Sequence, residues 1–198
     1  MENSAPTSIA FFTGFKVSDF LFLGEAALRT LLISVIAITS GSLFGILFGW
    51  LLAEFNRYLT SGLNLVLDIF RSVPLIIQLI LLYNFFPIVG IPLSPFVAGT
   101  IVLTIYTASL VAQVVRGGVE AVSLPMRRAA RSLGMSYFED IRYVVFPIGL
   151  RAVLPAWTGV ALGVLKDSAL VSVLGYIELL RASQILVTRT QEPFVILA

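Results

Sequence analysis

Long uncharged runs separated by short polar segments form the basic pattern of this chain. The first run, residues 30–53, contains no charged side chain. It is long enough to cross a hydrocarbon core of about 30 Å, which takes about 20 helical residues. Gly41, Gly45 and Gly49 recur at every fourth position in its second half, a spacing that lines one helix face and lets another backbone approach closely. The pattern predicts a transmembrane helix with one tightly packed face.

A second uncharged stretch, residues 72–115, has room for two more spans. Proline and glycine residues cluster between positions 87 and 95, and such residues gather where a helix must stop and turn. We therefore expect a second span near 63–86 and a third near 96–115.

The last third of the chain is apolar again from residue 152 to 177, apart from Lys166 and Asp167. We interpret 152–177 as a fourth span with an ionic interruption. A polar link follows, and residues 193–198 are expected to begin a fifth span that is cut short, since six residues cannot cross a bilayer.

The composition agrees with this pattern, because 58% of the 198 residues are hydrophobic and only 12% are charged. Soluble domains are nearer one half and about one quarter. The sequence thus predicts an all-α membrane protein, a single domain over 1–198 that forms a bundle of five transmembrane helices. The net charge of +2 gives no indication of nucleic-acid binding.

Missing residue types exclude several chemistries. With no His and no Cys, the chain has no thiolate, imidazole or zinc site of the usual kind and no Ser-His relay. The two lysines, Lys16 and Lys166, do not follow a glycine, so the chain lacks a GxxxxGK[ST] phosphate loop. We expect no cofactor or metal in this chain.

The cations are concentrated in the link between the third and fourth spans. That link holds Arg116, Arg127, Arg128, Arg131, Arg142 and Arg151. The link between the second and third spans holds none, and the positive-inside rule therefore places the arginine-rich link in the cytoplasm. The same rule predicts an N-terminus on the outside.

The arginine-rich link also predicts local structure. Residues 126–133 favour a helix after Pro125, with Gly134 at the position that follows a helix C-cap.

Ser136 and Glu139 form a capping-box pair for a second short, amphipathic helix, which Pro147 is expected to close. The aromatic residues Tyr137 and Phe138 on this helix suit either lipid headgroups or the groove of a partner protein, and the residues alone leave both interpretations open.

This segment resembles the EAA loop of ATP-binding-cassette importer permeases, the loop that docks on the ATPase. Arg128, Ala129 and Ala130 match the EAA core, Gly134 matches its glycine, and FPIGLRAVLP at 146–155 matches the proline pattern downstream. The resemblance implies a cytoplasmic coupling helix in this link. The docking residues that it implies are Arg128, Ala129, Ala130, Gly134, Ser136, Tyr137, Phe138 and Pro147.

More of the chain is similar to one subfamily, the permeases of polar amino-acid importers. Four further motifs occur in the order of that subfamily: RSVPLIIQL at 71–79, VVRGGVEAVSLP at 114–125, LKDSALVSVLG at 165–175 and QEPF at 191–194. The resemblance covers nearly everything from residue 28 to the end.

The resemblance implies a transmembrane subunit of an ATP-driven importer for polar amino acids in the bacterial inner membrane, and not an enzyme. ATP and Mg²⁺ would be bound by a cytoplasmic ATPase dimer. The other implied partners are a second permease, identical or different, an extracytoplasmic amino-acid-binding protein and membrane lipid.

Two positions depart from the family pattern. Arg128 stands where the EAA loop has its glutamate, and Gln113 stands where the third span often has a carboxylate. Because charge pairs across an interface set partner choice more than affinity, Arg128 predicts a partner-specific loop.

The substrate path is expected near the ionic interruption of the fourth span. A charge at the centre of a membrane helix costs about 2.5–3.5 kcal/mol and is often functional. The candidate path residues are Lys166, Asp167, Ser168, Gln113 and Gln78, with Asn84 and Thr104 as further polar residues in spans. The alternative is a structural ion pair between Lys166 and Asp167 that holds a helix break.

Two other function classes remain. An ion-coupled secondary transporter could use Lys166 and Asp167 as its coupling site, but it calls for an inverted repeat, and the two halves show no self-similarity. A non-transporting membrane scaffold would fit Arg128 and the incomplete last span.

Overall fold

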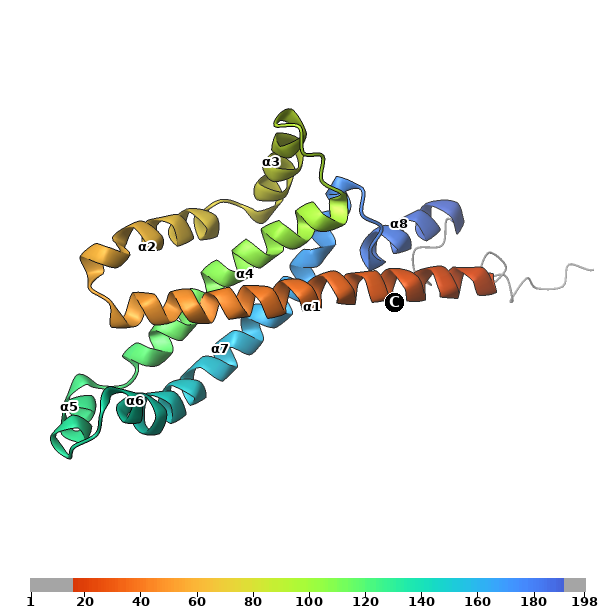
Figure 1. Ribbon diagram of the computed structural model, residues 1–198. Coiled ribbons are helices and arrows are strands. Elements are labelled where there is room, and N and C mark those ends of the chain that lie inside the picture. Colours follow the sequence, from red (N-terminus) through yellow and green to blue (C-terminus); the bar gives the residue numbers. More distant parts are fainter. Residues whose placement is uncertain (1–15, 191–198) are drawn as a thin grey trace, which may run out of the picture.

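A computed structural model describes residues 16–190, and in this range every regular element is a helix (Figure 1). The elements are α1 (Val17–Glu54), α2 (Arg57–Ser72), α3 (Leu75–Ile88), α4 (Pro95–Glu120), α5 (Leu124–Ser132), α6 (Tyr137–Asp140), a π-helical turn (Ile141–Val145), α7 (Phe146–Asp167), a 3₁₀ helix (Ser168–Leu174) and α8 (Leu179–Thr190).

Three helical segments in this range are long and apolar enough to cross a membrane: α1, α4 and the continuous stretch Tyr137–Leu174. The bent pair α2–α3 makes a fourth crossing if the two helices count as one span. The predicted fifth span, 193–198, lies outside the described residues. The chain is therefore an all-helical membrane protein with three or four spans in its described part.

The packing of α1 against α4 is the central contact of the bundle, and α4 crosses α1 obliquely in Figure 1. A Cβ atom added to Gly41 or Gly45 would lie 2.5 Å from the Cβ of Thr107 or Val111 on α4, respectively. One added to Gly49 would lie 2.4 Å from a backbone oxygen of α4. The glycine stripe is thus the close-packed face that its spacing predicts.

The segment expected as a second span, near 63–86, is sharply bent. Helix α2 ends at Ser72, α3 begins at Leu75, and the two are bent by 103°. The cause is Pro74, which lacks an N–H and disfavours helical backbone in the residue before it. Val73 accordingly adopts extended dihedrals, φ −81° and ψ 129°.

The fourth span shows the opposite behaviour at a proline. Pro147 does not close the helix that starts at Tyr137, because it lies in the first turn of α7 and the helical path continues through it. The N–H of Phe146 bonds to Ile141 O, five residues back, so the turn before Pro147 is wide enough for the ring. The expected separate helix at 136–147 is therefore the first part of the fourth span.

The helix type of this span changes next to Lys166 and Asp167. Helix α7 ends at Asp167 and the chain continues as a 3₁₀ helix to Leu174, where Gly175 follows with φ +90°.

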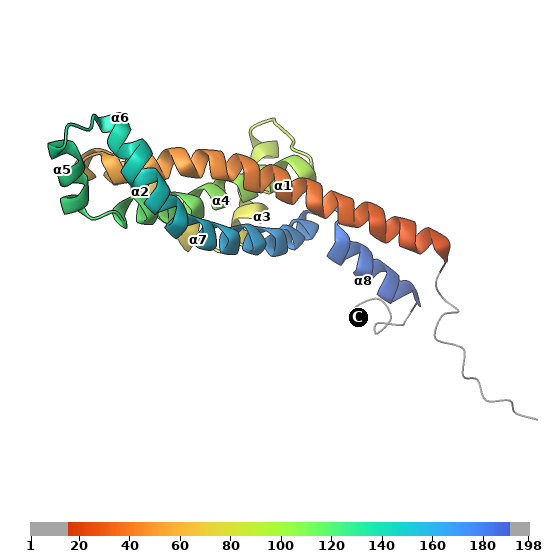
Figure 2. The ribbon, with the colours of Figure 1, turned by 90° about the horizontal axis from the view of Figure 1, so that it is seen from below.

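The polar link after Gly175 contains a helix, α8, that the sequence analysis did not predict. Glu178, 1% exposed, accepts hydrogen bonds from the N–H groups of Leu180 (2.8 Å) and Arg181 (2.7 Å) and so caps the start of α8. An ion pair between Arg189 and Asp19 ties α8 to α1. Helices α5 and α6 lie at the end of the molecule opposite α8 (Figures 1 and 2).

Candidate functional site

Helix α5 stands apart from the long helices and has a well-defined end. Gly134 has φ +93°. Its N–H bonds to Arg131 O at 3.0 Å, and the N–H of Met135 bonds to Ala130 O at 3.3 Å. These two bonds form the Schellman motif that ends a helix in a left-handed residue. The sequence-based prediction for Gly134 is confirmed, although α5 begins at Leu124 and includes Pro125 in its first turn.

The turn after α5 is closed by the predicted capping box. The N–H of Ser136 donates to Glu139 Oε2 (2.7 Å), and the N–H of Glu139 donates to Ser136 Oγ (3.4 Å). This reciprocal pair starts α6 and, through it, the long fourth span.

A buried ion-pair network joins α5 to two spans. Arg127 Nη1 donates to Glu54 Oε1 (2.6 Å) at the end of α1, and Arg127 Nε donates to Asp140 Oδ2 (2.9 Å) at the end of α6. The side chains of Arg127, Glu54 and Asp140 are 15%, 12% and 0% exposed. Hydrogen bonding to Glu54, and then to Asp140, raises the pKa of the Arg127 guanidinium.

Two further side chains complete the network. Tyr137 Oη donates to Glu54 Oε2 at 3.0 Å. The guanidinium of Arg131 lies over the Tyr137 ring, 5.5 Å from its centroid. Its Nε is 3.9 Å from Asp140 Oδ2. The second carboxylate oxygen of Asp140 is buried without a hydrogen-bond partner among the described residues.

The outer surface of this segment is apolar and cationic. Leu133 and Phe138 are 83% and 80% exposed, and Arg128 and Ala129 are also exposed. The carboxylates of Glu139 and Asp140 are engaged by the capping box and the network, so they do not neutralise Arg128.

The structure brings most of the predicted docking residues together and separates two of them. Arg128, Ala129, Gly134, Ser136, Tyr137 and Phe138 are exposed within α5, α6 and the turn between them. Ala130 is buried on the inner side of α5, and Pro147 lies further along the helical path, in the first turn of α7.

The alternative interpretation of the fourth-span interruption, an ion pair between Lys166 and Asp167, is not observed. In the described structure no salt bridge joins Lys166 to Asp167; Lys166 is exposed and Asp167 is half-buried. Ser168 is buried and donates to Leu165 O at 2.7 Å, which explains its polarity without a substrate.

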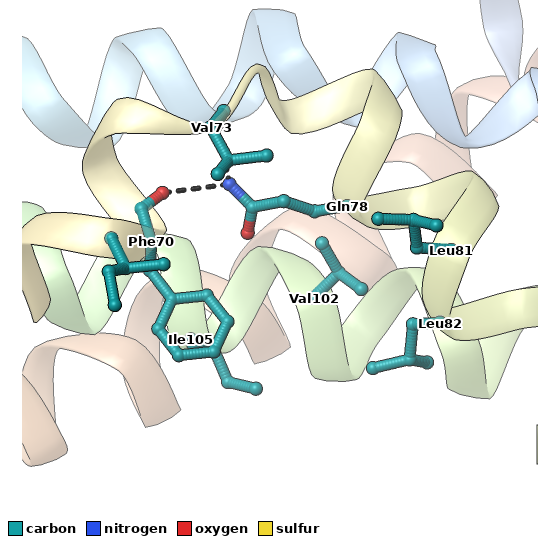
Figure 3. Close-up of a pocket in the computed structure, with 8 residues that line it drawn as sticks. Phe70, Val73, Gln78, Leu81, Leu82, Val102 and Ile105 are labelled. Atoms are coloured by element: carbon teal, nitrogen blue, oxygen red, sulfur yellow. Dashed lines mark hydrogen bonds between the residues drawn. The ribbon is translucent and has the colours of Figure 1, made fainter. Parts of the chain in front are cut away.

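Gln78 stabilises the bend between α2 and α3. Its Nε2 lies 2.7 Å from both Phe70 O and Val73 O, carbonyls that Pro74 leaves without helical partners (Figure 3). Its Oε1 is buried without a hydrogen-bond partner in the described structure and faces a cavity of about 260 Å³. The other residues that line the cavity are Ile69, Phe70, Val73, Leu81, Leu82, Val102 and Ile105.

Gln113 belongs to a different environment. Its Nε2 donates to Asn64 Oδ1 on α2 at 3.4 Å, and Asn64 in turn donates to Asp68 at 2.9 Å. Asn64 and Asp68 line a polar hollow of about 500 Å³ together with Arg116. Sequence reasoning missed this hollow, although the four-residue spacing of Asn64 and Asp68 would place both on one helix face.

The remaining polar candidates point elsewhere. Thr104 lies 2.9 Å from Ser40 Oγ across the α1–α4 contact, and Asn84 donates to Ile80 O in its own helix. Neither the cavity at Gln78 nor the polar hollow at Asn64 is lined by more than one of the predicted path residues.

The sequence analysis assigned no functional role to Glu54, Arg127 or Asp140. Glu54 and Arg127 are 73 positions apart, so no local pattern connects them. The available signal was Glu54 itself, a carboxylate at the end of a 24-residue uncharged run.

Comparison with known proteins supplies the family. Residues 41–198 match the model of the family described as binding-protein-dependent transport system inner membrane component. The chain is 33% identical over 174 residues to the putative glutamine transport system permease protein GlnP of Rickettsia conorii, covering 87% of this chain and 80% of that protein. It is 31% identical over 163 residues to the glutamine transport system permease protein GlnP of Escherichia coli K12, covering 81% and 74%.

Solved structures agree. A crystal structure of an amino acid ABC transporter with histidines superposes with a TM-score of 0.81 at 31% identity, covering 91% of this chain and 86% of that one. An inward-facing MetNI methionine ABC transporter shares the fold at 22% identity, with a TM-score of 0.75 and coverage of 92% and 91%. The chain belongs to the family of inner membrane components of binding-protein-dependent transport systems.

Proposed function

We propose that this chain is the membrane subunit of an ATP-driven importer for polar amino acids and that it docks its ATPase through α5 and the turn at Gly134. The observation that carries the proposal is an exposed helix that ends in a Schellman motif, stands apart from the spans and presents Arg128, Leu133 and Phe138 outward. The amino-acid substrate class is inferred from the glutamine and amino-acid transporters that the chain resembles.

The docking surface has the character of a helix that enters a partner's groove. Exposed apolar side chains flank α5, and an amphipathic helix binds a groove through such anchors. Arg128 adds an unneutralised cation, so the ATPase groove carries an acidic group opposite it. In this proposal α5 is the coupling helix between the third and fourth of five spans.

The orientation follows from charge. The α5 end, with its arginines, lies in the cytoplasm, and the N-terminus and the α8 end lie outside. An extracytoplasmic binding protein would then approach near α8.

The transport cycle takes its energy from the partner. Two permeases pair around a path, two ATPases bind ATP and Mg²⁺, and their closure moves the two α5 helices together. The bundles rotate as rigid bodies and open the path outward. This chain itself forms and breaks no covalent bond.

Asp167, Lys166 and Gln113 are the path residues that this proposal retains. Asp167 and Lys166 lie where α7 changes to a 3₁₀ helix. Gln113, on α4, donates to Asn64, one of the α2 residues that line the polar hollow. The Ser168 hydroxyl and the Gln78 side-chain amide both donate hydrogen bonds to backbone carbonyls, which favours structural roles for both residues.

Gly134→Leu tests the docking proposal. A leucine at φ +93° is strained and alters the turn, although no atom of the described structure lies within 4 Å of its Cβ. We expect at least a tenfold loss of amino-acid uptake and of ATPase co-purification, with normal membrane insertion. Gly62→Leu is the matched control, because Gly62 also has open space but has helical backbone. Normal uptake by Gly134→Leu would remove this turn from the mechanism.

A further inference from the structure

We propose that Arg127 is a positioning residue that links the ATPase-docking helix to two membrane spans at once, so that movement of α5 drives both. This inference rests on the proposed function. It concerns a residue that lies beneath the docking surface and is largely shielded by it, because the Arg127 side chain is only 15% exposed.

The geometry of the guanidinium carries the link. Nη1 and Nη2 lie 2.6 Å and 3.4 Å from the two oxygens of Glu54, and Nε lies 2.9 Å from Asp140 Oδ2. Glu54 is the last residue of α1, and Asp140 is followed without a break by the path of the fourth span. One planar side chain thus holds the ends of two long helices, which a lysine ammonium cannot reproduce.

Helix α5 makes few other contacts with the long helices. Ala130 is the one buried residue of α5, so apolar packing beneath the helix is slight. The backbone turns at its two ends connect it to α4 and α6 but not to α1. A displacement of α5 therefore reaches α1 chiefly through the bond between Arg127 and Glu54.

Charge makes this link specific. Glu54 is at the C-terminal end of α1, where a carboxylate opposes the helix dipole, and the last turn of α1 has no basic residue of its own. Arg127 supplies the missing cation. Without it, two carboxylates would lie close together in a poorly solvated site, since the side chains of Glu54 and Asp140 are 12% and 0% exposed.

Transmission beyond α1 is direct. The glycines of α1 place its backbone against α4 with no space for an added methyl group at Gly41, Gly45 or Gly49. A shift of α1 must therefore carry α4 with it. The second arm of the link, Asp140, acts on the fourth span, so a single side chain reaches three of the long helices.

The test measures coupling rather than assembly. The permease, its co-purified ATPase and binding protein are reconstituted in proteoliposomes, and substrate accumulated per ATP hydrolysed is compared between Arg127→Gln and wild type. We expect Arg127→Gln to retain the ATPase and its ATP hydrolysis while substrate per ATP falls at least fivefold. Arg127→Lys, which keeps the charge but not the fork, should give an intermediate ratio.

Two companion variants make the outcome decisive. Arg142→Gln removes an arginine from the same segment that stacks on Tyr143, 5.8 Å from its centroid, and should keep the wild-type ratio. The triple variant E54Q/R127Q/D140N removes the repulsion between the carboxylates, and we expect it to bind the ATPase yet remain uncoupled.

A wild-type ratio in Arg127→Gln or in the triple variant would overturn the proposal. So would loss of the ATPase from both, because Arg127 would then only shape the docking surface. Failure of the proposed function itself is distinguishable, since the wild-type chain would then co-purify no ATPase before any substitution is made.

Discussion

Glycine residues in this chain meet two unrelated physical requirements. Gly45 must lack a side chain because its Cβ would lie 2.5 Å from the Cβ of Val111, an atom that cannot move without the α4 backbone. Gly134 has open space around it, but its φ of +93° is strained for any other residue. The first requirement concerns packing between helices, and the second concerns the path of a single turn.

These two requirements predict different effects of the same substitution. Gly45→Ala forces α1 and α4 apart, and overpacking of this kind costs about 1–3 kcal/mol, so the unfolding midpoint of the purified subunit in detergent should fall clearly. Gly134→Ala costs about 1–2 kcal/mol locally, at the end of an exposed helix, and should change uptake more than the midpoint.

Thermal unfolding and uptake, measured on the same two variants, give the check. Equal midpoints for Gly45→Ala and wild type would show that the α1–α4 contact is looser than its geometry indicates.

Among the helices, two prolines illustrate what local sequence can and cannot predict. Pro74 ends α2 and produces the 103° bend, whereas Pro147 lies within a continuous helical path. Both follow an apolar or aromatic residue, and the outcome depends on the hydrogen-bond register of the preceding turn, a π turn before Pro147. That register is a property of the folded backbone, so the sequence predicted a break at the wrong proline.

Signals that depend on neighbours within about four residues were predicted well. The end of α5 at Gly134 and the capping box at Ser136 both agree with the structure. The link from Glu54 to Arg127 crosses 73 positions, and the separate surroundings of Gln78 and Gln113 depend on which helix each one faces. Neither feature can be predicted from the sequence alone, because both depend on contacts between distant parts of the folded chain.

Gln78 donates hydrogen bonds to two carbonyls at the bend between α2 and α3, which leads to a prediction for this pair of helices. Gln78→Met keeps the length of the side chain but leaves Phe70 O and Val73 O without their donor. A buried, unsatisfied polar group costs about 1–3 kcal/mol. We expect a lower unfolding midpoint and an unchanged order of substrate preference, measured by competition for uptake. A changed preference order would instead place Gln78 on the substrate path.

The molecule as a whole has two chemically different ends. Helices α5 and α6 form one end, with exposed arginines and apolar side chains, and α8 lies at the other, tied to α1 through Asp19 (Figure 2). Between them run the long apolar helices, and α1 alone, with 38 residues, measures about 57 Å at 1.5 Å per residue. This exceeds the roughly 30 Å of a hydrocarbon core, so α1 extends beyond the core and its ends are accessible from opposite sides.

The absence of cysteine allows that orientation to be tested with single introduced thiols. Leu133→Cys, at an 83% exposed position after α5, should react with a membrane-impermeant maleimide only in inverted membrane vesicles. Gln184→Cys, on the exposed face of α8, should react only in right-side-out vesicles. Leu43→Cys is the control, because that position is 67% exposed but lies within the uncharged run of α1, and lipid should keep the reagent away from either side.

The same thiols connect orientation to docking, because an ATPase seated on α5 covers position 133 but not position 184. Added ATPase should slow labelling of Leu133→Cys at least fivefold in inverted vesicles and leave Gln184→Cys unaffected in right-side-out ones. Labelling of both positions from one side would contradict the topology. Labelling from opposite sides with no protection by the ATPase would keep the topology and move the docking surface away from the end of α5. The side from which the thiols react tests the topology that the arginines predict, and protection by the ATPase tests docking at the exposed apolar surface.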